Sequence, residues 1–318
     1  MVGVYGNEKI LEEFSLRSQE GRLPHSLLIL GDRGGGKKTL AKSLAQLYLS
    51  GDDPEKTRHL LETGNHPDFH LIQDKDKGLK KQDMMDFIEE SQKTAYLSES
   101  QVFLIDHVDD LTPQGQNALL KSLEEPKPGV AVFLTGTNKG KILPTILSRC
   151  RIVQVPPLSQ EEVRTLLKER GYGKREGLEE AVHFSRGSLG RALDLLDQEE
   201  KIKIYQDLFR GVQGFSRKSR DYPFVFSEFF LDHKDILEDL VFQLLVYYRD
   251  LLLLREDKKS KLIYLPDRFQ AQGGQGLKTS SLYTIIKTIQ KSMEYFSHNG
   301  NKRLGIEALL IKIQEEYL

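Results

Sequence analysis

Residues 31–39, with the sequence GDRGGGKKT, have the residue types and the spacing of a loop that binds phosphate. Glycines let such a loop turn several backbone N–H groups toward one anion, and a lysine at its end adds a positive charge. This chemistry predicts a nucleotide or phosphate site; a glycine-rich strand-to-helix turn that holds no ligand is the alternative. With an acidic residue from a later strand, the candidate binding residues are Gly31, Gly34, Gly36, Lys37, Thr39 and Asp106.

The loop departs from the usual pattern at its Mg²⁺ position, where a serine or threonine hydroxyl is expected. Lys38 stands there, and its charge would compete with Mg²⁺ for the phosphates. Thr39 has a hydroxyl, but it lies about 100° further around the new helix, so we expect it to point elsewhere. The sequence therefore leaves open whether ATP and Mg²⁺ bind here.

A second acidic element ends the apolar run VFLID at Asp106, where a carboxylate can reach Mg²⁺ directly or through water. ATP hydrolysis usually needs a further carboxylate that orients the attacking water. The next residue is His107, whose imidazole can act as a base but at a different spacing. Asp109 and Asp110 are alternative carboxylates, although their position in a turn predicts that they start a helix.

The hydrophobic pattern predicts the scaffold that would hold these residues. Apolar runs at 25–31, 101–106 and 129–137 are typical of buried parallel strands, and residues 150–155 are a further candidate. Helical patterns lie between these runs, and one follows the glycine-rich loop. The sequence therefore predicts an α/β fold with a doubly wound parallel sheet, in which the loop joins a strand to a helix.

The composition changes at Pro156–Pro157, after which the patterns are helical to the end of the chain. Ser159 and Glu162 have the spacing of a capping box, which predicts the start of a helix. Helical patterns lie on both sides of residue 205. The expected domains are a phosphate-loop domain, a small helical lid and an all-α domain, at residues 1–158, 159–205 and 206–318.

Overall composition limits the class of protein. The chain has 318 residues, of which 29% are charged and 38% hydrophobic, and its formal net charge is −1. This balance argues against a strongly basic nucleic-acid-binding protein, and no apolar run approaches the roughly 20 residues that span a bilayer. We therefore expect a cytoplasmic protein without membrane contact. Cys150 is the one cysteine, which excludes an intramolecular disulfide and a multi-cysteine zinc site.

Several segments resemble the clamp-loader branch of the AAA+ ATPases, the subunits of the bacterial DNA polymerase III clamp loader. The most specific are QNALLKSLEEP at 116–126 and LPTILSRC at 143–150, which carries a Ser-Arg-Cys motif around Arg149. The resemblance extends from about Gly6 to Leu310. It implies an AAA+ phosphate-loop domain, a helical lid and an all-α collar.

The resemblance also implies an assembly. Clamp-loader subunits form an open hetero-pentameric ring that uses ATP to place a sliding clamp on primed DNA. Motor subunits of the gamma/tau type bind and hydrolyse ATP at subunit interfaces. A rigid partner subunit supplies an arginine finger to a neighbour's ATP. The implied partners of this chain are therefore gamma/tau-type and delta-type subunits, with clamp and DNA reached through the complex.

The differences from the motor pattern all lie at positions that would act on a nucleotide bound by the chain itself. Lys38 removes the Mg²⁺ hydroxyl, and His107 replaces the family's catalytic Glu. Gly190 stands where motor subunits place a nucleotide-sensing Arg, with Arg191 adjacent. Arg149 is kept, and a guanidinium can grip phosphate oxygens in pairs. The resemblance therefore implies a non-catalytic subunit whose Arg149 acts in trans; an ATP-hydrolysing motor subunit or another P-loop ATPase is the alternative.

Many bacterial relatives have a four-cysteine zinc module ahead of the segment NHPDFH, but residues 50–70 contain no cysteine here. Structural zinc needs four ligands, usually with Cys among them. His59, His66 and His70 are therefore expected to be ordinary loop residues, with no metal site. Cys150 is expected to pack as a small buried residue, not to act as a nucleophile.

Two further patterns concern the second half of the chain and its loops. The segment 241–257 is apolar on many sides, which predicts either a core helix or a helix completed by other chains, with Arg249 and Asp250 as a pair or a contact to a neighbour. Charged segments at 73–81 and 255–261 are expected to be solvated loops, the first with DNA phosphate as an alternative contact.

Overall fold

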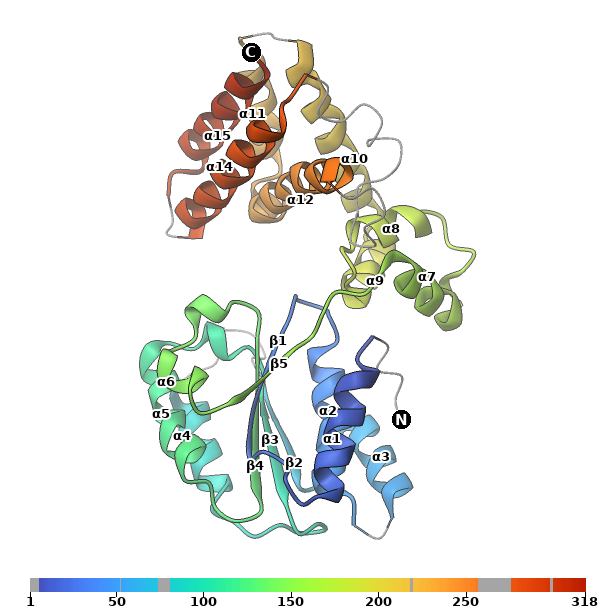
Figure 1. The fold of residues 1–318 in the computed structure, drawn as a ribbon, viewed down its shortest axis with the longest axis vertical. Coiled ribbons are helices and arrows are strands. Elements are labelled where there is room, and N and C mark those ends of the chain that lie inside the picture. Colours follow the sequence, from blue (N-terminus) through green and yellow to red (C-terminus); the bar gives the residue numbers. More distant parts are fainter. Residues whose placement is uncertain (1–5, 52, 74–80, 218–219, 257–275, 298–299) are drawn as a thin grey trace. The chain divides into compact units, whose positions relative to one another are not determined.

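The computed structural model describes residues 6–51, 53–73, 81–217, 220–256, 276–297 and 300–318 (Figure 1). They form two compact units, Met1–Leu158 and Ser159–Leu318. The charged loops expected at 73–81 and 255–261 lie largely outside the described residues. Among the described helices, none combines the length and the hydropathy that a membrane span requires.

The first unit is built on a five-stranded parallel sheet in the order β2–β3–β4–β1–β5. Every residue of β1, β3 and β4 is buried, because helices cover both faces of the sheet. The predicted doubly wound parallel sheet is confirmed. The strands are β1 (Ser26–Leu30), β2 (Phe69–Ile72), β3 (Gln101–Ile105), β4 (Val130–Gly136) and β5 (Arg151–Gln154).

The helices of the first unit form two layers, with α1, α2 and α3 on one face of the sheet and α4, α5 and α6 on the other (Figure 1). Successive side chains of a strand point to opposite faces of the sheet, so Leu27 and Leu28 pack in different hydrophobic clusters. The helices are α1 (Glu8–Gln19), α2 (Lys37–Leu49), α3 (Pro54–Thr63), α4 (Lys81–Glu90), α5 (Pro113–Glu124) and α6 (Pro144–Leu147), with the 3₁₀ turns η1 (Val108–Asp110) and η2 (Lys139–Lys141).

The described part of the second unit is helical throughout. Its first helix begins at the predicted capping box, since Ser159 Oγ accepts from the backbone N–H of Glu162 and the Glu162 side chain accepts from Ser159 N–H. The helices are α7 (Gln160–Leu167), α8 (Leu178–Phe184), α9 (Leu189–Asp197), α10 (Glu199–Gln213), α11 (Tyr222–Asp232), α12 (Leu237–Glu256), α14 (Thr279–Ser297) and α15 (Lys302–Tyr317), with the short turns η3 (Lys168–Tyr172), η4 (Gly214–Arg217) and η5 (Lys234–Ile236).

The boundary expected at residue 205 falls in the middle of α10, which is continuous from Glu199 to Gln213. Tyr205 itself is buried, and its ring packs edge-on against Phe184 of α8 at 5.3 Å between centroids. The chain is therefore helical through residue 205, and the boundary between the second and third expected domains stays a prediction.

Helix α12 forms the centre of the second unit. Tyr247, Tyr248 and Asp250 are fully buried on it, and it packs against α10, α11 and α14. The Arg249 Nε donates to Asp250 Oδ1 at 2.8 Å, which satisfies part of the buried carboxylate. The interpretation of segment 241–257 as a core helix thus agrees with the packing of its described residues.

Candidate functional site

The glycine-rich loop lies between the end of β1 and the start of α2. Gly34 and Gly36 have φ values of 73° and 87°, which glycine adopts without steric strain. At Gly31 an added Cβ would lie 3.0 Å from Val155 Cβ, just after β5, so a larger residue would have to displace this neighbour slightly. The loop therefore keeps the backbone conformation of a strand-to-helix turn that presents helix N-terminal N–H groups.

The Lys37 side chain is turned back into its own loop. Its Nζ donates to Gly31 O and to Asp32 O, both at 2.8 Å. Burial lowers the pKa of Lys37, and the negative charge of Asp106 and nearby carboxylates offsets part of this effect. The ammonium that would pair with outer phosphates thus already has backbone oxygen partners.

At the Mg²⁺ position, Lys38 supplies an ammonium. Its Nζ lies 3.0 Å from Asp106 Oδ2 and donates to Gln73 Oε1 at 3.3 Å. Asp106 is 6% exposed, and its Oδ1 accepts from the Thr135 hydroxyl at 2.5 Å. Burial acts to raise the pKa of Asp106, but the hydrogen bonds from Thr135 and Lys38 outweigh it and lower the pKa. Because Mg²⁺ needs oxygen ligands and meets a cation here, these residues do not fit it.

Thr39 lies in the first turn of α2, one residue after Lys38. Together with Lys38, Lys42 and Leu61 it lines a cavity of about 340 Å³ beside α2, α3 and β2. That the Thr39 hydroxyl points away from the Mg²⁺ position stays a prediction.

His107 adopts a left-handed backbone conformation with φ of 57°, which is uncommon for a residue with a side chain. Its backbone N–H donates to Thr135 Oγ1 at 3.0 Å, and its Nε2 lies 3.9 Å from Asp106 Oδ2. The imidazole therefore lies beside the acidic group that ends β3.

The two alternative carboxylates lie in the turn η1, where the sequence predicts helix-start residues. Asp109 is buried, and its Oδ2 accepts from the backbone N–H groups of Thr137 and Asn138 at 2.9 and 2.8 Å. This side chain fixes the end of β4. Asp110 is exposed on the same turn.

Arg149 lies two residues after the end of α6, and a third of its side chain is exposed. Its Nε donates to Glu124 Oε1 at 2.5 Å, and its Nη1 donates to Thr145 O at 2.9 Å. The adjacent Cys150 is buried, and burial raises the pKa of its thiol to about 12. The thiol is therefore protonated near neutral pH, which fits packing and not nucleophilic chemistry.

Gly190 and Arg191 open helix α9 in the second unit. The Arg191 guanidinium forms a hydrogen-bonded ion pair with Asp239 of α12, and the Tyr205 hydroxyl also donates to Asp239. The partner interactions outweigh the burial of Arg191, so its pKa is raised. Arg191 is thus engaged within its own unit, and no sequence pattern predicted Asp239 as its partner.

The three histidines have separate environments. His59 is exposed on α3, His66 is buried and its Nδ1 accepts from Asp68 N–H at 3.2 Å, and His70 stacks on Phe103 with centroids 4.5 Å apart. Within the described ranges, no group of three or more His, Cys, Asp or Glu side chains is arranged to hold a metal ion.

One residue of the segment NHPDFH has a structural role that the sequence analysis missed. The Asp68 carboxylate is buried and accepts the backbone N–H groups of Tyr96, Leu97 and Ser98 at 2.5 to 2.8 Å. It holds the loop before β3, where Tyr96 is 88% exposed. The available sequence signal for this role was an aspartate, Asp68, directly before the strand β2.

Comparison with known proteins finds similarity to DNA polymerase III subunits. Residues 6–159 match the family described as DNA polymerase III, delta subunit. The chain is 29% identical over 317 residues to the DNA polymerase III subunit delta' of Bacillus subtilis, covering 93% of each protein. It is 31% identical over 207 residues to the gamma subunit of Buchnera aphidicola subsp. Baizongia pistaciae, covering 61% of this chain and 56% of that protein.

Among solved structures, a gamma subunit-related protein of Thermotoga maritima matches with a TM-score of 0.43 and 16% identity, over 96% of this chain and 99% of that one.

A parallel sheet of this order, with a glycine-rich loop after β1 and a helical second unit, defines a P-loop protein of the AAA+ class. Within that class, the chain resembles the subunits of the DNA polymerase III clamp loader, and its similarity to the delta-prime subunit extends over nearly its whole length.

Proposed function

We propose that this chain is a non-catalytic, rigid-partner subunit of the clamp loader, of the delta-prime type. It places Arg149 against ATP bound by a neighbouring subunit while a sliding clamp is loaded onto primed DNA. The observation that carries the proposal is the Lys38–Asp106 pair, at 3.0 Å, which puts a cation of the chain itself at the Mg²⁺ position.

The phosphate loop has lost the groups that act on its own nucleotide. Lys38 removes the hydroxyl ligand, and Lys37 already donates to two backbone oxygens. His107 stands in place of a carboxylate that would orient the attacking water. Binding of Mg-ATP would have to compete with these internal contacts, and hydrolysis would still lack its base.

Arg149 keeps the properties that action on a neighbour requires. It lies at the surface of the first unit, and a guanidinium stays charged at every physiological pH. In other P-loop systems an arginine finger is worth about 10³–10⁵ in rate. The partners in this proposal are gamma/tau-type and delta-type subunits of a hetero-pentamer, in the cytoplasm.

An ATP-hydrolysing motor subunit of the gamma/tau type is the second candidate. The positive φ values of Gly34 and Gly36 favour it, because they preserve the backbone of a phosphate loop. The isolated chain with Mg²⁺ and ATP distinguishes the two functions. Clear turnover that disappears in Lys37→Ala would contradict the rigid-partner role.

The decisive experiment reconstitutes the complex from this chain with its motor and clamp-opening subunits and measures clamp-stimulated ATP hydrolysis. We expect stimulation with the wild-type chain and a large loss with Arg149→Ala. Arg151→Ala is the matched control, since Arg151 is a nearby exposed arginine that pairs with Glu13 in its own unit. Unchanged activity with Arg149→Ala would refute the trans role.

A further inference from the structure

In the free chain, the Arg149 guanidinium is engaged by its own unit. Its Nε and Nη2 both contact Glu124 Oε1, the first at 2.5 Å. Its Nη1 donates to Thr145 O at 2.9 Å and to Ser148 Oγ at 3.2 Å. A guanidinium has five N–H donors, so these contacts leave only one of them free.

This arrangement leaves no complete pair of donors for a phosphate. Bidentate binding needs two parallel N–H groups on one edge of the guanidinium. The edge formed by Nε and Nη2 faces Glu124, and both hydrogens of Nη1 are directed to Thr145 and Ser148. Arg149 must therefore exchange at least one of these partners before it can grip a phosphate.

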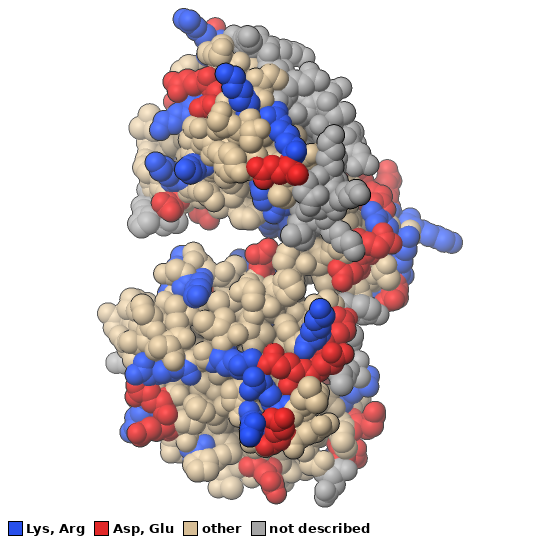
Figure 2. Space-filling view, viewed as in Figure 1, with Lys and Arg blue, Asp and Glu red and all other residues tan. Residues whose placement is uncertain are grey.

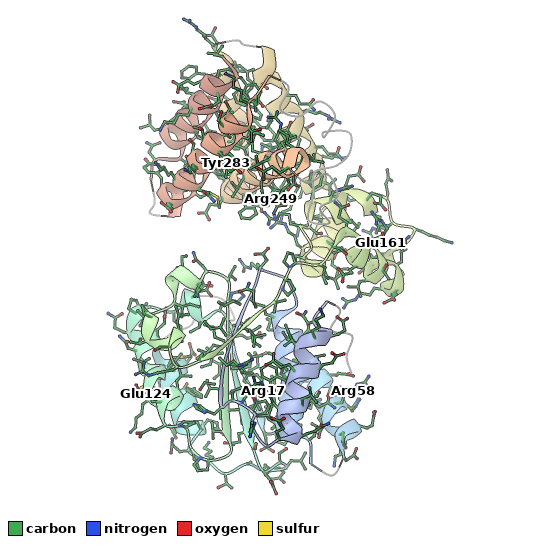
Figure 3. The ribbon with its side chains drawn as sticks, in the orientation of Figure 1. Arg17, Arg58, Glu124, Glu161, Arg249 and Tyr283 are labelled. Atoms are coloured by element: carbon green, nitrogen blue, oxygen red, sulfur yellow. The ribbon has the colours of Figure 1, made fainter. Side chains whose placement is uncertain are left out.

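Glu124 is the partner that such an exchange would release. It is the last residue of α5, where the negative end of the helix dipole disfavours a carboxylate, and Glu125 follows it directly. Arg149 offsets this local excess of negative charge. Glu124 is 46% exposed and lies in the outer helical layer of the first unit, so its carboxylate can turn into water once the arginine leaves (Figure 3).

The negative charge of Glu124 would also repel a phosphate that binds Arg149. A carboxylate in contact with the guanidinium would lie within a few ångströms of the phosphate oxygens that the same guanidinium binds, and like charges at that distance repel. An exposed ion pair is weak, worth at most about five-fold in an equilibrium. A phosphate can therefore displace it.

We propose that Glu124 holds Arg149 in a closed position in the free chain, and that the phosphate of a neighbour's nucleotide displaces Glu124 when the interface forms. The proposal rests on the proposed trans role of Arg149 and adds a regulatory contact to that site. Glu124 thus competes with ATP for the finger and does not touch the nucleotide.

The test uses Glu124→Gln in the reconstituted complex. We expect half-maximal ATP hydrolysis at a two- to five-fold lower ATP concentration than with the wild-type chain. The gain should shrink as ionic strength rises, because salt screens exposed ion pairs. Glu125→Gln is the matched control: it removes a neighbouring exposed charge that takes part in no ion pair among the described residues, and it should leave the ATP dependence unchanged.

A double variant separates the two proposals. Arg149→Ala combined with Glu124→Gln should behave as Arg149→Ala alone. If Arg149→Ala has no effect, the trans role itself fails. If Arg149→Ala is inactive and Glu124→Gln lowers activity, or matches Glu125→Gln, then Glu124 does not compete with the phosphate and the closed position is overturned.

A measurement on the free chain needs no partner subunits. Exchange of the Arg149 Nε–H with water, followed by nuclear magnetic resonance, should be slow in the wild type and at least several-fold faster in Glu124→Gln. Equal exchange rates in a variant with unchanged thermal unfolding would show that Glu124 does not hold the arginine.

Discussion

The phosphate loop and the Ser-Arg-Cys segment each pair a basic side chain with a carboxylate, but the two carboxylates differ in burial. Asp106 is 6% exposed, whereas Glu124 is 46% exposed. A buried carboxylate needs a permanent partner, since removing it leaves an uncompensated charge away from water. An exposed carboxylate can exchange its partner for water at little cost.

This difference in burial supports the different roles that we propose for two basic residues. Lys38 would be a fixed counter-ion at the motif position of the Mg²⁺ ligand, and Arg149 would be a charge that the chain can release. On the face in Figure 2 acidic and basic side chains are mixed, in keeping with the net charge of −1, so the contrast arises from particular pairs and not from a charged surface.

We expect the largest effect from removing the guanidinium of Arg149. Arg149→Ala should reduce hydrolysis at the neighbour's site by about 10³-fold or more, because no other group replaces the finger. Single-turnover hydrolysis in the reconstituted complex measures this rate. The chain itself should remain folded, with thermal unfolding close to that of the wild type, and a loss of folding would make Arg149 a structural residue instead.

We expect a smaller effect from neutralising the buried carboxylate of Asp106. Asp106→Asn should lower the free energy of unfolding by about 1–2 kcal/mol, since the environment of Asp106 stabilises its charged form, while the half-exposed Lys38 limits the loss. Urea denaturation measures the change. Asp110→Asn, on the exposed turn nearby, is the control and should change stability by less than about 0.5 kcal/mol. If both variants lowered the free energy of unfolding equally, burial would not distinguish Asp106 from an exposed carboxylate.

Two histidines of the first unit make its stability depend on pH. Burial lowers the pKa of His66 and His70 below the ordinary value of 6.5. Below pH 6.5 the unfolded chain takes up protons that the folded chain resists, so the free energy of unfolding is greatest above pH 6.5 and falls toward the lowered pKa values. The free energy of unfolding should therefore be lower at pH 5.5 than at pH 7.5, which urea denaturation at the two pH values measures.

The matched variants for this pH dependence are His70→Gln and His59→Gln. His70→Gln should weaken the slope of stability against pH, because it removes one buried titrating ring. His59→Gln changes an exposed ring and should preserve the slope. A slope that depends on His59 instead would show that burial is not its cause.

We expect the smallest effect on ATP turnover by the isolated chain. Lys38→Thr restores the hydroxyl at the Mg²⁺ position, yet we expect no measurable ATP turnover, since position 107 still lacks a carboxylate. Steady-state phosphate release from the isolated variant tests this. Measurable turnover in the single variant would show that His107 is no obstacle to hydrolysis.

Sequence patterns predicted the parts of this structure that are local. The strands at β1, β3, β4 and β5, the capping box at Ser159 and the position of the glycine-rich loop all follow from periodicity, glycine and capping residues within one segment. The expected boundary at residue 205 falls inside α10 and stays a prediction, because helical periodicity does not show where one helical domain ends and the next begins.

The fold class, the family resemblance and the residue types behind the proposed non-catalytic role could be derived from the sequence. The pairing of Lys38 with Asp106, of Arg191 with Asp239 and of Arg149 with Glu124 became known from the folded structure. Each pair joins segments distant along the chain, and side-chain pairing depends on how strands and helices are brought together, which no local pattern encodes. The burial of each carboxylate, and hence whether its partner can leave, is likewise a property of the packed fold.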